Sequence, residues 1–178
     1  MSASRVAKRY ARALLELAAE QNQLEAWGDE LERLARVVES PDLASRLTSP
    51  ELPEPLRLQA VTKIAERLQL SFPLRSFAVV VARHGRIDAT GAISHAYQTL
   101  LDERLGRVRA NLTFAAQPSD GELVKVVASL ERLVGKKVIS TIKVDRALLG
   151  GVIAEIEGKI YDASLETRLQ EAQRRLSE

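Results

Sequence analysis

Apolar residues recur at intervals of three and four along the first 105 positions, which is the spacing of helices with one face against a core. Prolines and glycines interrupt this pattern and divide it into short segments. The six predicted helices cover residues 6–17, 24–38, a short segment after Pro41, and residues 58–68, 72–84 and 87–105. Six short helices with brief connections predict a bundle.

The spacing of apolar residues changes to two after Gly106. Residues 107–114 alternate between apolar and polar side chains, as a half-buried strand does. Ser119 and Glu122 then have the spacing of a capping box, which predicts a helix that ends at Gly135. Two further alternating or apolar segments, residues 138–144 and 152–160, predict two more strands.

A last helix is expected after Asp162-Ala163-Ser164. Its apolar face would carry Leu165, Leu169, Ala172 and Leu176. The fold class predicted from these patterns is mainly α with a small α+β part. An N-terminal six-helix bundle (residues 1–105) is followed by a small C-terminal sheet-plus-helix domain (residues 106–178).

Composition excludes several kinds of site. The 178 residues include no cysteine, which rules out a disulfide framework, a zinc–thiolate site, an iron–sulfur cluster and a thiol nucleophile. Because 26 basic residues face 24 acidic ones, the net charge is only +2, and neither half has the charge of a polyanion-binding tail. No apolar stretch reaches the ~18 residues of a membrane span, so a soluble protein is expected.

The basic N-terminus has two interpretations. Residues 1–15 contain Arg5, Lys8, Arg9 and Arg12 and no acidic residue, as a mitochondrial presequence would. The same apolar stripe, however, continues without a break past Glu16, which favours the first helix of the folded domain. The four basic residues are then expected to form a solvated face, and nucleic-acid binding is not predicted because no aromatic stacking platform accompanies them.

No catalytic, cofactor or metal site is predicted. His84 falls at a helix end and His95 within a helix, where surface or capping roles suffice. Gly150-Gly151 leads into a strand and is not followed by the Lys and Ser/Thr of a phosphate loop, so a bulge or a close backbone approach is expected there. Glu155 and Glu157 share one face of the predicted strand 152–160 without a histidine beside them.

The predicted fifth helix has more apolar surface than one core requires. Leu74, Ala78 and Val81 form one stripe, and Phe77, Val80 and His84 form a second. The first helix adds three small residues, which would let another helix approach closely: Ala7, Ala11 and Ala18. Either the bundle encloses these faces itself, or they form a groove for a partner helix. The pattern leaves both interpretations open.

Several motifs resemble those of the F-type ATP synthase delta subunit, the family of the mitochondrial oligomycin-sensitivity-conferring protein. Residues 144–152 (VDRALLGGV), continued through Ile156 to 162–164 (DAS) and Leu169, resemble its C-terminal signature. Residues 9–14 (RYARAL), Trp27 and Gly85-Arg86 resemble its N-terminal half. The resemblance spans essentially the whole chain and implies a structural role for the signature residues Leu149, Gly150, Gly151, Asp162 and Ser164.

This resemblance implies a non-catalytic stator component without cofactors. The bundle would bind the N-terminal helix of an alpha subunit of the catalytic head, and the C-terminal domain would contact the b subunits of the peripheral stalk. Membrane association would be indirect, through the complex, on the cytoplasmic face of a bacterial plasma membrane. The groove expected to receive the alpha helix is lined by Tyr10, Ala13, Leu14, Phe77 and Val80. The alternative is a free-standing helical adaptor or regulatory protein that could bind nucleic acid.

Overall fold

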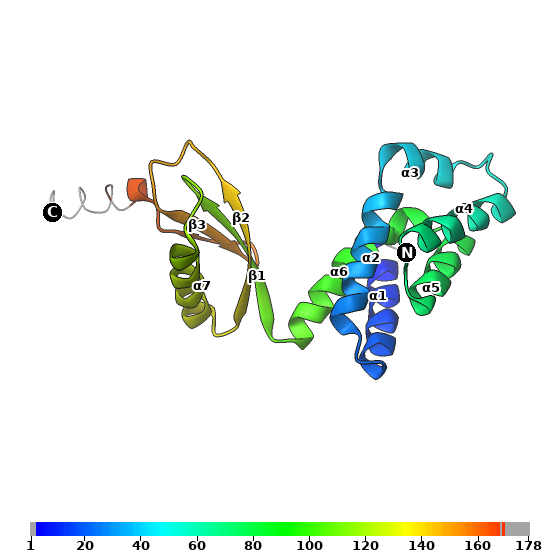
Figure 1. Cartoon of the computed structure of the whole chain (residues 1–178), viewed down its shortest axis with the longest axis horizontal. Coiled ribbons are helices and arrows are strands. Elements are labelled where there is room, and N and C mark those ends of the chain that lie inside the picture. The colour runs from blue at the N-terminus through cyan, green and yellow to red at the C-terminus, as the bar shows by residue number, and fades with distance from the viewer. Residues whose placement is uncertain (1–2, 168, 170–178) are drawn as a thin grey trace. The chain divides into compact units, whose positions relative to one another are not determined.

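The computed structural model describes residues 3–167 and 169, and the chain divides into two compact units. We call the part up to Leu101 the helical unit and the part from Asp102 the sheet unit. The division falls inside the last helix of the bundle, a few residues before the boundary expected from the change of period at Gly106. Figure 1 shows the helices of the first unit and the strands of the second.

The helical unit is built from short α-helices and one 3₁₀ turn. Their bounds are α1 (Ala3–Glu20), α2 (Leu24–Val38), α3 (Pro41–Thr48), α4 (Glu54–Arg67), α5 (Phe72–Arg83), η1 (Ile87–Ala89) and α6 (Thr90–Arg104). Prolines occupy the first turns of α3, α4 and α5, where an absent N–H costs nothing. The expected sixth helix is correct from Thr90 onward, but its first residues form the tighter η1 turn. The four basic residues near the N-terminus lie in α1, as the interpretation as a first helix of the folded domain predicts.

A side chain from α2 satisfies the start of α5. Glu30 accepts hydrogen bonds from the backbone N–H of Ser71 (2.7 Å) and from its hydroxyl (2.9 Å). Because Ser71 is the N-cap residue of α5, this carboxylate supplies an acceptor that the first turn lacks. The contact fixes where α5 begins relative to α2.

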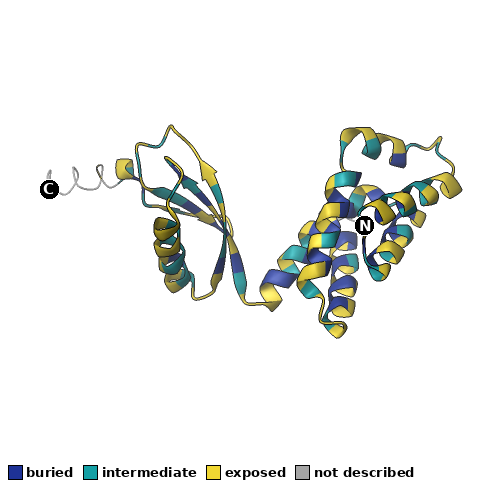
Figure 2. Cartoon of the chain, viewed as in Figure 1, coloured by how far each residue is buried: buried dark blue, intermediate teal, exposed yellow. Residues whose placement is uncertain are grey.

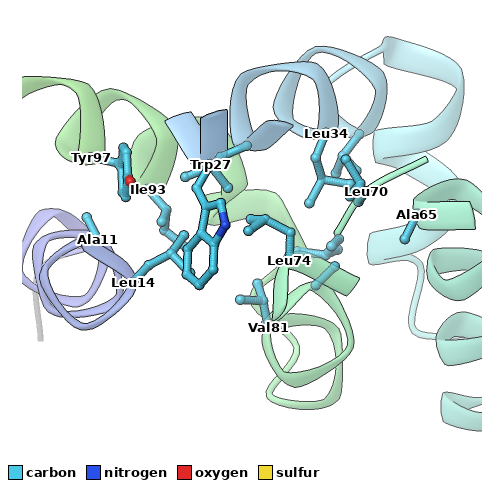
Figure 3. Packing of buried hydrophobic residues seen from close by; sticks show 14 of the residues in the cluster. Ala11, Leu14, Trp27, Leu34, Ala65, Leu70, Leu74, Val81, Ile93 and Tyr97 are labelled. Carbon is cyan, nitrogen blue, oxygen red and sulfur yellow. The ribbon is translucent and has the colours of Figure 1, made fainter. Parts of the chain in front are cut away.

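The core of the helical unit is continuous across its helices. In the view of Figure 3, the Trp27 indole lies between Leu14 of α1 and Leu74 of α5. Tyr97 of α6 is fully buried, and its hydroxyl donates to the carbonyl oxygen of Leu24 (2.7 Å). Burial of this phenol raises its pKa. Each helix thus turns one side to the core and another to solvent (Figure 2).

The sheet unit is a four-stranded mixed sheet with one helix of known bounds. Its elements are β1 (Arg107–Phe114), α7 (Asp120–Val134), β2 (Lys137–Val144), β3 (Val152–Ile156) and β4 (Lys159–Asp162). The strand order is β2-β1-β3-β4; β1 pairs in parallel with β2 and antiparallel with β3. The apolar residues of β1 point to the core, as the alternation predicts. Residues of β1, α7, β2 and β3 form the core of the sheet unit.

The capping box that begins α7 is confirmed. The Ser119 hydroxyl accepts from the backbone N–H of Glu122, and the Glu122 carboxylate accepts from the backbone N–H of Ser119 (2.9 Å). The bond from the Ser119 backbone N–H, and after it the bond that the Ser119 hydroxyl donates to the same carboxylate (2.7 Å), lower the pKa of Glu122. The helix ends at Gly135, whose φ of +68° is the left-handed conformation common after a C-terminus.

The segment 152–160 is not one strand. The chain reverses at Glu157 and Gly158, whose φ angles are +50° and +78°, and Ile156 pairs with Lys159 across the turn. Positive φ at two successive residues is the conformation of a tight hairpin. As a consequence Glu155 lies in β3 and Glu157 in the turn, so the expected pair on one strand face does not form. The predicted last helix is helical at residues 165–167 and 169; Ala172 and Leu176 lie outside the described residues.

Candidate functional site: an apolar surface on α1 and α5

The two stripes of α5 have different environments. Leu74, Ala78 and Val81 are buried, at 1% exposure or less. Phe77 is half-buried, and Val80 is 42% exposed although it is apolar. The core of the helical unit therefore uses the first stripe, while the second stripe still reaches solvent.

The small residues of α1 serve the core and not a partner. Ala7, Ala11 and Ala18 are all buried, so the close approach they permit is to other helices of this unit. The alternative that the bundle encloses its own apolar faces is thus correct for this stripe. Ala13 is exposed on a different side of α1, and Leu14 is only 3% exposed.

A second apolar stripe on α1 contacts that of α5 through the pair Tyr10 and Phe77. Tyr10, Ala13 and Leu17 are spaced three and four residues apart and share a side of the helix. The ring of Tyr10 meets that of Phe77 edge to face, with centroids 6.1 Å apart. We call the residues Tyr10, Ala13, Leu17, Phe77 and Val80 the α1–α5 surface. Leu17, which is 49% exposed, was not predicted as a site residue, although its spacing from Tyr10 could have indicated it.

The predicted lining of the groove is thus distributed between surface and core. Tyr10, Ala13, Phe77 and Val80 reach the surface, whereas Leu14 lies beneath them in the core near Trp27. A partner on this surface would gain apolar contact chiefly from the exposed parts of Val80 and Leu17. It would touch Leu14 little.

Basic side chains border this surface. Arg5, Lys8, Arg9 and Arg12 are all exposed on α1, and the guanidinium carbon of Arg9 lies 5.9 Å from the centroid of the Tyr10 ring. A shallow hollow of about 380 Å³ lies over α1. Its lining consists of Arg5, Lys8, Arg9, Arg12, Ala13 and Glu16.

The two histidines have structural positions. His84 is the C-cap residue of α5, and its Nδ1 lies 2.8 Å from the carbonyl oxygen of Val80. His95 is exposed on α6. Within residues 3–167 and 169, no group of three His, Asp or Glu side chains could hold a metal ion. No helix in this part of the chain is long and apolar enough to cross a bilayer.

In the sheet unit, the two glycines of the predicted signature allow one segment to cross another. The backbone N–H of Leu165 donates to the carbonyl oxygen of Gly150 (2.9 Å), and that of Ala163 donates to Val152 (2.9 Å). A Cβ at Gly151 would overlap the carbonyl oxygen of Ala163 and lie 2.8 Å from the Cα of Ser164. A Cβ at Gly150 would lie 2.6 Å from Cδ1 of Leu165. The expected close backbone approach at Gly150-Gly151 is confirmed.

Asp162 and Ser164 cap the turn that follows this crossing. Asp162 accepts from the backbone N–H of Ser164 (2.8 Å) and from the hydroxyl of Thr167 (2.8 Å). Hydrogen bonds from the Ser164 backbone, the Ser164 side chain and the Thr167 side chain lower the pKa of Asp162. The Ser164 hydroxyl in turn accepts from the backbone N–H of Thr167 (3.3 Å). The pattern matches an N-cap and begins the last helix.

Three apolar side chains near this turn remain exposed. Leu149 is 74% exposed, Leu169 64% and Leu165 48%. A neighbouring hollow of about 460 Å³ lies between the end of β1, the start of α7 and Gly151-Val152. The signature residue Leu149 therefore differs from the glycines beside it, because it packs little against this chain.

Comparisons with known proteins agree with these features. Residues 6–176 match the model of the family described as ATP synthase delta (OSCP) subunit. The ATP synthase subunit delta of Anaeromyxobacter sp. (strain Fw109-5) is 37% identical over 97% of both chains, and that of Geobacter sp. (strain M21) is 32% identical over the same share.

A solved structure has the same fold. One chain in the cryo-EM structure of the Toxoplasma gondii mitochondrial ATP synthase hexamer superposes with a TM-score of 0.67 over 97% of both chains, at 20% identity. This likeness concerns the fold alone. The match of the family model over nearly the whole length and the identities above 30% concern the sequence, and on them the chain belongs to the ATP synthase delta (OSCP) subunit family.

Proposed function

We propose that the protein is a non-catalytic stator component of an F-type ATP synthase, linking an alpha subunit of the catalytic head to the b subunits of the peripheral stalk. The observation that carries the proposal is the second apolar stripe of α5, which remains exposed beside α1 in a chain of the delta subunit family. A helix with an unpartnered apolar stripe suits a groove-type contact with an amphipathic helix.

The mechanical task explains why such a contact is apolar. Rotation of a central shaft exerts torque on the head, and a tether must hold the head in place without cycling between states. Exposed ion pairs contribute little to stability and are weakened by salt. A desolvated apolar contact is not weakened by salt. The α1–α5 surface would supply that contact for the N-terminal helix of alpha.

The sheet unit would carry the other contact, with the b subunits. The exposed side chains of Leu149, Leu165 and Leu169 offer apolar surface for it. Neither unit would contribute catalytic residues, cofactors or metal ligands. The protein would be held peripherally at the cytoplasmic face of a bacterial membrane by the rest of the complex.

Substitution of Val80 by Asp tests the contact with alpha. A carboxylate in a desolvated helix contact costs several kcal/mol, so affinity for a peptide of the alpha N-terminus should fall by about a thousandfold. Leu56→Asp is the matched control, because Leu56 is 51% exposed on α4 of the same unit. It should leave the affinity unchanged. Calorimetry measures both after circular dichroism has shown that the variants fold.

Two outcomes would contradict this assignment. A folded Val80→Asp variant that binds the alpha peptide like the wild type would show that the surface is not the contact. Loss of folding in Val80→Asp but not in Leu56→Asp would show that Val80 serves the core of the unit.

The role of the sheet unit is tested by deleting residues 107–178. The shortened chain should still bind the alpha peptide and should no longer recover b subunits from solubilised membranes. If b subunits are still recovered, the roles are wrongly divided between the units.

A further inference from the structure

We propose that the α1–α5 surface selects a helix whose flank is acidic where it borders the N-terminal two-thirds of α1. The proposal rests on the proposed function, since it specifies the chemistry of the partner at that same surface. The partner is thus an amphipathic helix with an apolar stripe and carboxylates beside it, and charge complementarity identifies it.

Positive charge is concentrated on the two helices that form the surface. Up to residue 15 the chain has four basic residues and no acidic one, and α5 contains Arg75 and Arg83 but no acidic residue. Residues 1–105 nevertheless carry 14 basic and 14 acidic groups, so their sum is zero. Apart from Glu16 and Glu20 in the C-terminal part of α1, the acidic groups of the bundle therefore lie outside these two helices, for example on α2, which has Glu25, Asp29, Glu30 and Glu32.

The basic side chains of α1 are not neutralised by carboxylates of the described part of the chain, although the guanidinium of Arg9 lies over the Tyr10 ring. In the described part of the chain, Arg5, Lys8, Arg9 and Arg12 form no ion pair, although Arg36 on α2 does so with Glu32 (2.9 Å). Arg5, Arg9 and Arg12 are four and three residues apart, so they share one side of the helix. That row is free to meet the carboxylates of another chain.

The basic row is continuous with the apolar surface. Ala13 belongs to the α1–α5 surface and also lines the hollow over α1 together with the basic side chains. Arg9 lies at the ring of Tyr10, which contacts Phe77. A helix that packs its apolar stripe on Tyr10 and Ala13 therefore places its flank beside Arg9 and Arg12.

The charge of α1 also gives the partner a direction. Glu16 and Glu20 are the first acidic residues of the helix and lie near its C-terminal end. Carboxylates of the partner are favoured beside Arg5 to Arg12 and disfavoured beside Glu16 and Glu20. The acidic residues of the partner should therefore cluster toward one end of its helix.

The basic row should chiefly increase the selectivity for an acidic helix and the rate of association, and it should raise affinity moderately. Each exposed pair changes affinity by at most about fivefold, and complementary charge raises the association rate at low salt. Reversing two arginines replaces attraction by repulsion and should weaken binding by about tenfold or more at low ionic strength. The difference should nearly vanish in 0.5 M salt, where the Debye length falls to a few ångströms.

The experiment uses the full chain and two synthetic 20-residue amphipathic peptides. Both have the apolar positions of the alpha N-terminal helix; one has Glu on the flank and the other has Lys. Calorimetry at 20 mM and 500 mM salt should show that the wild type prefers the Glu peptide at low salt only. Arg9→Glu/Arg12→Glu should reverse the preference. Arg33→Glu/Arg36→Glu, the same charge change at exposed positions of α2, should preserve it.

Equal affinity of the wild type for the two peptides at low salt would overturn the inference, and so would a preference for the Lys peptide. If Val80→Asp still weakens binding of the alpha peptide in that case, the proposed function stands and only the charge selection fails. Binding to phosphatidylglycerol vesicles that depends on Arg9 and Arg12, without a preference for the Glu peptide, would assign the row to a lipid and also overturn it.

Discussion

At the scale of single residues, the signature glycines Gly150 and Gly151 matter because a side chain would not fit at their positions, and not because they take part in a reaction. Gly151 has φ +85°, and the carbonyl of Ala163 and the Cα of Ser164 occupy the place of a side chain. Gly121 of α7 has open space around it and no positive φ. A comparison of Gly151 with Gly121 therefore distinguishes a glycine that a close backbone approach requires from an ordinary helical glycine.

Gly151→Ala should therefore destabilise the sheet unit by more than about 2 kcal/mol, since strain in the left-handed region adds to a backbone clash. Gly121→Ala should stabilise it by about 0.5 kcal/mol by reducing the freedom of the unfolded chain. Urea unfolding followed by circular dichroism measures both. A mild effect at Gly151 would mean that the crossing of residues 163–165 over the glycines is loose.

Tyr97 should make the helical unit sensitive to alkaline pH. Its pKa is raised by burial, so above about pH 10 the unfolded chain loses a proton that the folded chain keeps, and stability falls as pH rises. Tyr97→Phe should cost about 1 kcal/mol at pH 7, through the lost bond to Leu24, and should remove this extra alkaline loss. Urea unfolding followed by Trp27 fluorescence from pH 7 to 11 measures it, with Tyr161→Phe as control. Equal alkaline slopes for wild type and Tyr97→Phe would refute it.

At the scale of elements, periodicity predicted most helices and strands because each buries one face. The capping box at Ser119 and Glu122 could be predicted because its two residues are close together in the sequence. The turn at Glu157 and Gly158 was missed because apolar residues on both sides made β3 and β4 look continuous. The strand order and the crossing partners of Gly150-Gly151 depend on contacts distant in the sequence, which no local spacing encodes.

The candidate surface shows the same limit. The spacing on α5 separated its two stripes correctly, since the period of a helix alone decides which residues share a side. It could not decide which stripe faces the core, and on α1 it assigned a possible role in partner binding to alanines that are buried. Whether an apolar side is covered depends on where the other helices lie.

The two kinds of alanine on α1 give a direct test. Ala11 is fully buried, so Ala11→Leu should overpack the core and destabilise the helical unit by about 1–3 kcal/mol. Ala13 is exposed, so Ala13→Leu should leave stability unchanged and weaken binding of the alpha peptide by filling the space that the partner helix needs. Thermal unfolding and calorimetry on the same samples separate the effects. Unchanged peptide binding by Ala13→Leu would remove Ala13 from the contact.

At the scale of the whole molecule, a buried carboxylate near the end of α6 binds two arginines of β1, a contact that sequence reasoning did not predict. Asp102 accepts from Nε of Arg107 (2.7 Å) and from Nε of Arg109 (2.5 Å). Arg107 and Arg109 follow Asp102 by five and seven positions, and the turn at Gly106 lies between Asp102 and both arginines. No helical or strand spacing therefore links them to Asp102. Asp102 is buried, whereas Arg109 is half exposed.

Asp102→Asn should lower the stability of the sheet unit by about 2 kcal/mol. The substitution removes the charge of a buried carboxylate that accepts from both guanidinium groups, and water at the half-exposed Arg109 recovers part of the cost. Glu32→Gln is the matched control, because its pair with Arg36 is exposed on both sides and should contribute at most about 0.5 kcal/mol.

Trp27, the single tryptophan, lies in the helical unit, so its fluorescence follows that unit while circular dichroism follows both. In Asp102→Asn the dichroism transition should therefore move to lower urea while the fluorescence transition stays in place. If the two transitions move together, the effect of the substitution is not confined to the sheet unit and the prediction is wrong; if neither moves, the buried carboxylate contributes nothing that solvent cannot replace.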